Sequence, residues 1–181
     1  MASERQQAKQ PVSALLAGPY GHPWHPILVT VPIGAWVASL VFDIGSRAVA
    51  GAGYLAQGSL WLIAVGVLGA LVAACAGFLD LFAIPTGTPA SRTALVHMGL
   101  NLAVTAAYVV NFVWRRGDPA SVGSGMMALS AASLAALAVS GTLGGKLAFR
   151  YGVRVADESM QADGYVTRHR SAAHGSEGGV S

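Results

Sequence analysis

The sequence predicts an all-α integral membrane protein, a bundle of four transmembrane helices. Of its 181 residues, 54% are hydrophobic and only 10% are charged, whereas a soluble domain is about 25% charged. The hydrophobic residues gather in four long runs, and helices of this length cross a hydrocarbon layer of about 30 Å. The expected spans cover about residues 26–48, 59–84, 91–114 and 122–149.

Prolines and glycines mark the expected helix boundaries. Pro32 lies inside the first span and should kink it, because proline lacks the backbone donor and crowds the preceding turn. The segment 85–89 reads Pro-Thr-Gly-Thr-Pro and should end the second span. Ser91 is then expected to cap the third span, and the polar stretch that starts at Arg115 to stop it.

Polar segments flank the predicted four-helix domain of residues 20–151. Residues 1–19 are expected to be a polar arm, and no cleavable signal peptide is expected in them. Residues 152–181 are rich in glycine, serine and charge, a composition typical of disorder. The tail histidines His169 and His174 are interpreted as solvated side chains.

The basic residues predict an orientation, because cytoplasmic loops carry more lysine and arginine. With four spans, both termini and the middle loop share one side. That side holds eight basic residues: Arg5, Lys9, Arg92, Lys146, Arg150, Arg154, Arg168 and Arg170. The other side holds three: Arg47, Arg115 and Arg116. The excess predicts that the N- and C-termini lie on the cytoplasmic side.

Helical periodicity predicts one inward face on each span, since polar residues in a membrane turn away from lipid. On the first span this face carries His25, Pro32, Trp36, Ser39 and Asp43. On the third it carries His97, Asn101, Thr105 and Tyr108. Small residues on the second and fourth spans form seams that allow close helix approach: Gly66, Gly69, Ala73, Gly77 and Asp80, then Ser133, Leu137, Ser140 and Gly144.

Depth along the spans separates two polar clusters. The cytoplasmic cluster combines His22, His25, Asp80, His97 and Asn101. The outer cluster combines Asp43, Tyr108 and Asn111. Ionisable residues inside membranes are functional candidates, and three titratable groups on three helices converge in the first cluster.

Structural interpretations of the same residues stay open. His22 and His25 could cap a helix start, and His97 could bond Asp80 or a backbone carbonyl. Asp80 could pair with Arg92 or Lys146, and Asp43 with Arg47 one turn away. Cys75 is expected to pack among small apolar residues.

The motifs resemble those of a bacterial family of predicted four-helix membrane proteins of unknown function. The similar segments are His22-Pro23-Trp24-His25-Pro26 (HPxHP), His97-Met98-Gly99-Leu100-Asn101 (HxxxN), Gly77-Phe78-Leu79-Asp80, the loop around 84–90, and Gly141-Thr142-Leu143-Gly144-Gly145. The resemblance implies a multi-pass protein of the bacterial inner membrane. Some relatives are linked to Rieske-type iron–sulfur domains, so a redox partner of this kind is implied, although this chain has one cysteine and cannot hold such a cluster itself.

Four functions remain open from the residues. His25 and His97 could be axial ligands of haem b, with His22 and Asn101 beside them. His22, His25, His97 and Asp80 could bind a divalent metal. Asp43, Tyr108, Asn111 and Asp80 could relay protons together with the histidines. The fourth hypothesis is a structural or partner-binding subunit without chemistry, which could form a homo-oligomer.

Other functions are disfavoured. No serine has a partner base of known proximity and no phosphate-binding loop occurs, so nucleophilic catalysis is not expected. The basic tail is better suited to anionic lipid than to nucleic acid. The first and third spans both begin with histidine, but the residue matches are too few to establish a repeat.

Overall fold

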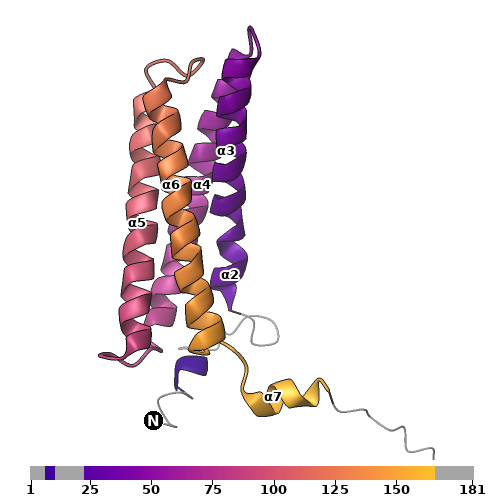
Figure 1. The fold of residues 1–181 in the computed structure, drawn as a ribbon, viewed down its shortest axis with the longest axis vertical. Coiled ribbons are helices and arrows are strands. Elements are labelled where there is room, and N and C mark those ends of the chain that lie inside the picture. The colour runs from indigo at the N-terminus through magenta and orange to yellow at the C-terminus, as the bar shows by residue number, and fades with distance from the viewer. Residues whose placement is uncertain (1–6, 11–22, 166–181) are drawn as a thin grey trace, which may run out of the picture.

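The computed structural model describes residues 7–10 and 23–165, and within them every regular element is a helix. Four long helices stand side by side in an up-and-down bundle (Figure 1). They are α2 (Trp24–Leu28) continued by α3 (Thr30–Ala48), α4 (Gly53–Leu81), α5 (Pro89–Arg115), and α6 (Ser124–Gly145) continued by the π-helical turn η3 (Lys146–Arg150). All four are long and apolar enough to cross a membrane, which confirms the predicted fold class.

Pro32 explains why the first span is divided. Its ring nitrogen cannot donate to the carbonyl of Leu28, and its ring crowds that carbonyl. The helix breaks there, so that α2 ends at Leu28 and α3 starts at Thr30. The ladder of helical hydrogen bonds is therefore interrupted where the sequence places the proline, while Val29 between the two segments keeps helical dihedral angles.

The helix ends follow local chemistry. Gly51 adopts a φ of 72° in the tight turn between the first two spans, and α4 then begins at Gly53, earlier than expected. Thr88, rather than Ser91, caps α5: its hydroxyl oxygen accepts a hydrogen bond from the Ser91 backbone N–H at 3.1 Å. Pro89 occupies the first turn, where a missing N–H costs nothing.

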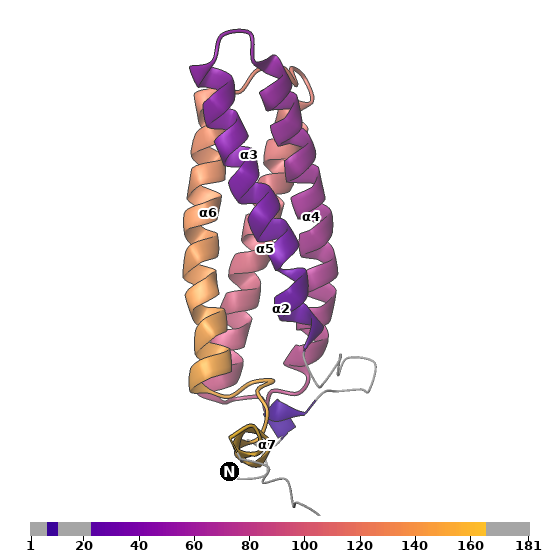
Figure 2. The ribbon, with the colours of Figure 1, turned by 90° about the vertical axis from the view of Figure 1, so that its right-hand side faces the viewer.

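The helices occupy the corners of a square in chain order. The closest packing is of α3 along α4 and of α5 along α6; α4 also contacts α5, and α3 contacts α6 least. The parallel helices α3 and α5 therefore face each other across the bundle axis (Figure 2).

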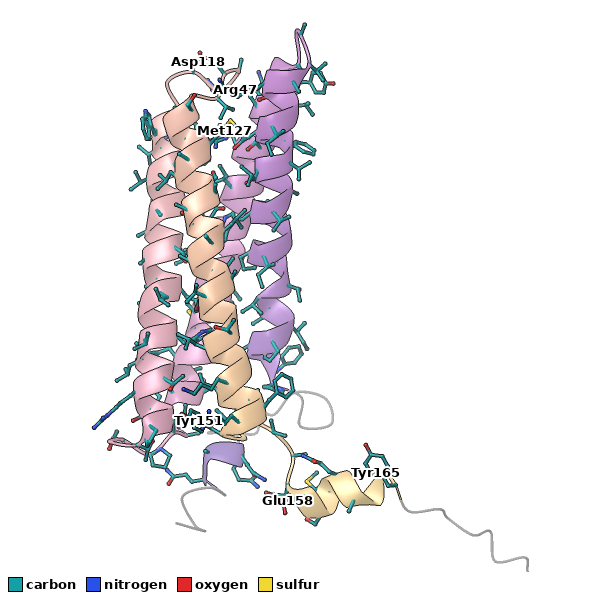
Figure 3. The ribbon with its side chains drawn as sticks, in the orientation of Figure 1. Arg47, Asp118, Met127, Tyr151, Glu158 and Tyr165 are labelled. Atoms are coloured by element: carbon teal, nitrogen blue, oxygen red, sulfur yellow. The ribbon has the colours of Figure 1, made fainter. Side chains whose placement is uncertain are left out.

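The two ends of the bundle differ in chemistry. We call the end with His25 and His97 the histidine end, and the opposite end, near Arg47 and Arg115, the arginine end. In Figure 3, Arg47 marks the arginine end and Tyr151 the histidine end.

Aromatic rings fill the middle of the bundle. Trp36 and Tyr108 stack at 4.1 Å between ring centroids, with an interplanar angle of 8°, and Ile63 and Val104 complete this buried cluster. Large aliphatic side chains on the outer faces are exposed, as lipid contact requires. Cys75 is exposed as well.

The chain after the bundle folds back at the histidine end. The Arg154 backbone N–H donates to the Ala8 carbonyl at 3.0 Å, and Lys9 forms an ion pair with Asp157 at 3.5 Å. A short helix, α7 (Glu158–Asp163), follows within the segment for which the sequence predicted disorder. His169 and His174 lie outside the described residues.

Candidate functional site: two polar clusters on the bundle axis

A buried ion pair joins α3 and α5 at the arginine end. The Arg115 guanidinium donates to both Asp43 carboxylate oxygens, Nη1 to Oδ1 and Nη2 to Oδ2, each at 2.7 Å. The two side chains are 1% and 0% exposed. Such a bidentate arrangement is among the strongest charge-assisted contacts in proteins.

Polar side chains from the other helices complete this cluster. Arg115 also donates to Asn111 Oδ1 at 2.7 Å and to Ser59 Oγ at 3.0 Å. Asn111 in turn donates to Ser130 Oγ at 2.9 Å. All three nitrogens of the guanidinium thus donate to side-chain oxygens in a buried site, which makes the cluster a closed structural clamp.

The proposed pairing of Asp43 with Arg47 is wrong. Arg47 instead donates to the Val122 carbonyl at 3.0 Å and to Ser124 Oγ at 3.3 Å, outside the bundle interior. The correct partner is Arg115, which the sequence predicts to begin the loop after the third span. It lies one turn beyond Asn111, on the face that already carries His97, Asn101 and Tyr108, so the helical spacing could have identified it.

The two histidines meet at the other end. His25 Nδ1 lies 2.9 Å from the Ala73 carbonyl on α4, and His97 Nδ1 lies 2.8 Å from the Ser140 carbonyl on α6. The ring centroids are 6.3 Å apart with an interplanar angle of 83°. The prediction that His25 and His97 share one interior is confirmed by this contact.

These bonds fix the tautomer of both rings. A carbonyl oxygen only accepts hydrogen bonds, so the proton must be on Nδ1 in His25 and in His97. Nε2 of each neutral ring therefore keeps its lone pair.

Asn101 covers His97 without occupying Nε2 in the ring plane. Its Nδ2 donates to the His97 carbonyl and to Ser140 Oγ, each at 2.8 Å. The same Nδ2 is 3.2 Å from His97 Nε2 and 3.4 Å from Nδ1. Asn101 Nδ2 is thus almost equidistant from the two nitrogens of the His97 ring. An atom at these distances within the plane of the imidazole would overlap ring carbon atoms, so the amide lies over the face of the ring.

Two glycines make room for the rings. A Cβ at Gly77 would lie 2.9 Å from His25 Nδ1 and Cε1, and one at Gly144 would lie 3.1 Å from His97 Cε1. The small residues thus have a second role besides close helix packing, because Gly77 and Gly144 leave the space that the His25 and His97 rings occupy.

A family model decides what kind of protein this is. The model described as "Predicted membrane protein (DUF2231)" matches residues 21–157. The chain belongs to the DUF2231 family. No curated protein and no solved structure matches the chain.

The matched DUF2231 segment includes both clusters and Arg154, which the sequence did not single out. Arg154 Nε lies 3.0 Å from Asp80 Oδ1, so Asp80 pairs with Arg154 rather than with Arg92 or Lys146. Lys146 lies over the Tyr151 ring, 5.5 Å from its centroid.

The remaining site predictions separate by position. His22 lies outside the described residues. Among those that are described, no three His, Cys, Asp or Glu side chains are grouped closely enough to hold a metal ion. The expected relay residues divide between the ends: Asp43, Asn111 and Tyr108 belong to the arginine half, Asp80 to the histidine end, and the Trp36–Tyr108 stack lies between.

Proposed function

We propose that the His25–His97 pair binds a transition-metal centre through its two Nε2 atoms, with haem b iron as the occupant. The protein would then be a small redox subunit of the membrane. The observation that carries the proposal is the anchoring of both rings through Nδ1–H to backbone carbonyls. Metal-ligating histidines almost always donate their second ring nitrogen in this way, which fixes the tautomer and the ring orientation.

The two imidazoles come from opposite hairpins and are near neighbours. The centroids of His25 and His97 are 6.3 Å apart, so both rings could contribute ligands to one centre.

The number of ligands favours haem over a bare ion. Zinc sites use three or four protein ligands, and the described residues offer no group of three. The haem macrocycle supplies four nitrogens of its own, so that two imidazoles complete the coordination of its iron. The four-ligand set with His22, His25, His97 and Asp80 is therefore the weaker proposal.

Haem binding requires the two hairpins to part near the histidines. The apolar hollow between α5 and α6, lined by Leu100, Val104, Ser133 and three alanines, has a volume of about 220 Å³, below the roughly 300–1,000 Å³ of typical cofactor sites. One feature favours opening: α3 and α6 contact each other least among neighbouring helices.

A visible absorption spectrum of the purified protein tests the proposal. Native protein from haem-supplied cells should show a Soret band and a reduced-minus-oxidised α band, and both should be lost in His25→Ala and His97→Ala. His169→Ala, in the tail, is the matched control and should keep both bands. Protein that shows no haem bands after expression with haem and after direct haem addition would refute this assignment.

A structural role for the histidines is the second candidate. The two Nδ1 hydrogen bonds tie α2 to α4 and α5 to α6, which stabilises the bundle without chemistry. In that case His25→Asn and His97→Asn lower the melting temperature, while haem and metal contents stay at zero in the native protein.

We also propose the bacterial inner membrane as the location, with both termini cytoplasmic. Arg115 forms a buried ion pair and so no longer counts as a loop charge, which strengthens the excess of basic residues on the predicted cytoplasmic side. An electron-transfer partner, such as a Rieske-type protein, would then dock at the histidine end, where the site is nearest to water.

A further inference from the structure

The buried faces of α3 and α5 repeat one another along the chain. Asp43 and Arg115 are 72 positions apart, and the same offset relates other inward-facing pairs. These pairs are His25 and His97, Pro32 and Val104, Trp36 and Tyr108, and Ser39 and Asn111. All of them except the half-buried histidines are buried.

The paired residues also meet in space. His25 contacts His97 at one end, Trp36 stacks on Tyr108 in the middle, and Asp43 binds Arg115 at the other end. Because α3 and α5 run in the same direction at opposite corners of the bundle, a two-fold rotation about the bundle axis exchanges the members of each pair.

The second helix of each hairpin supplies a buried serine at the arginine end. Ser59 on α4 accepts from Arg115 of the other hairpin, and Ser130 on α6 accepts from Asn111 of its own hairpin. At the histidine end, the carbonyls of Ala73 and Ser140 hold the two rings. In both helices a glycine one turn further on, Gly77 or Gly144, seats the ring. The sequence offset between matching residues of α4 and α6 differs by one helical turn between the Ser59–Ser130 pair and the Ala73–Ser140 pair. A shift of one turn leaves the same helix face inward.

We infer that the protein is built from two structurally equivalent helical hairpins, residues 23–81 and 89–150, each of which presents a surface made for the other. The hairpins resemble two subunits of a dimer joined by the loop at 82–88. The inference concerns assembly and is independent of whether the histidines bind a metal.

The buried ion pair determines which hairpins can pair. Two copies of the first hairpin would place two Asp43 carboxylates together on the axis, and two copies of the second would place two Arg115 guanidiniums there. Neither pairing is tolerable, because like charges repel strongly where no water screens them. Asp43 and Arg115 thus act as the residues that specify an unlike pair on an otherwise equivalent interface.

Exchanging residues across the axis in the full chain tests this inference. The quadruple variant S39N/D43R/N111S/R115D reverses the roles of the hairpins but keeps the same four side chains on the axis. In this variant an amide precedes the guanidinium by one turn on the first hairpin, as Asn111 precedes Arg115 on the native second hairpin, and Ser59 and Ser130 exchange roles. The single variants D43R and R115D place like charges together and serve as the unpaired references.

The measured quantities are the yield of monodisperse protein in detergent and its melting temperature. We expect each single variant to lose more than about five-fold in yield, and the quadruple variant to return within about two-fold of the native yield, since the like-charge contact is abolished.

An uncharged exchange provides a second variant in case the moved charges disturb membrane insertion. W36Y/G66L/Y108W/L137G transfers the tryptophan, with the glycine that seats it, to the other hairpin. Its reference variants are Y108W and G66L. Y108W enlarges the side chain without a glycine opposite to make room for it, and G66L fills the space that Trp36 occupies beside Gly66. The inference is supported if either exchange variant recovers yield and melting temperature relative to its single-substitution references. It is overturned if both exchange variants have yields and melting temperatures no higher than those of their references.

Discussion

Replacing Gly66 by alanine should disrupt the aromatic stack at the centre of the bundle. A Cβ at Gly66 would overlap the Trp36 ring, lying 2.8 Å from Cε2 and still closer to Cδ1 and Nε1. Trp36 has little room to move, because it stacks on Tyr108 at 4.1 Å and its Nε1–H donates to the Ile63 carbonyl at 3.4 Å. The overlap falls on a rigid ring within a closed core.

The opposing energies decide the sign of the Gly66→Ala effect. Overpacking a core costs about 1–3 kcal/mol, and disturbing the ring stack costs about 0.5–1.5 kcal/mol more. Alanine gains at most about 1 kcal/mol in helix propensity, and less here, because the unfolded state in a membrane is still helical. We therefore expect a net destabilisation of about 1–4 kcal/mol.

Thermal unfolding in detergent, followed by near-ultraviolet circular dichroism, measures this loss and the loosened stack together. Gly99→Ala is the matched control: it also lies within a span, but no atom is within 4 Å of its added Cβ. Gly99→Ala should melt at or slightly above the native temperature. Trp36→Phe in the Gly66→Ala background should recover part of the loss, because the smaller ring relieves the overlap. A Gly66→Ala protein that melts like the native one would refute the reasoning.

The ion pairs and the ring seats predict the effects of three further sets of substitutions. Arg115→Met leaves the Asp43 carboxylate buried and unpaired, so it should destabilise the protein by about 3–5 kcal/mol in the same melting assay. Arg116→Met, at the next and exposed position, is the control and should change stability by less than about 0.5 kcal/mol. Equal melting temperatures of the two variants would contradict this prediction. Gly77→Ala and Gly144→Ala should displace the rings from their carbonyls, which ¹⁵N-histidine NMR detects as a loss of the Nδ1–H signals; Gly141→Ala, which has open space around its Cβ, should keep them. Asp80→Asn should release the segment 152–165 and raise its hydrogen–deuterium exchange while α6 stays protected, because the contact with Arg154 is lost; unchanged exchange in that segment would show that Asp80 does not hold it.

The fold could be predicted from the sequence because lipid imposes simple rules. Four apolar runs of spanning length leave few alternatives to a helical bundle. Helical spacing then identified the inward faces of the first and third spans, including the pair His25 and His97, because polar side chains cannot face lipid.

The partners of the charged residues could not be predicted in the same way. From the sequence, Arg115 resembles a loop residue because it follows the last apolar residues of its span, and its pairing with Asp43 depends on how two helices face each other across the bundle axis. Arg154 lies in a polar segment whose path back to Asp80 has no periodic signal. Sequence spacing reports which face a residue occupies, but only the packing of helices brings two faces together.

Each end of the bundle has a pair of polar residues on the axis, but the two pairs differ in how many of their polar atoms are free to bind a ligand. At the arginine end, the carboxylate and the guanidinium use their hydrogen-bonding capacity on each other and on Asn111 and Ser59, and both are sealed from solvent. Groups that are paired and enclosed in this way have little left with which to bind a ligand. At the histidine end, each ring uses Nδ1 to bond a carbonyl, so Nε2 of the neutral ring keeps its lone pair. The proposed binding chemistry therefore belongs at the histidine end, and the role we infer for the arginine end is to specify which hairpin faces which.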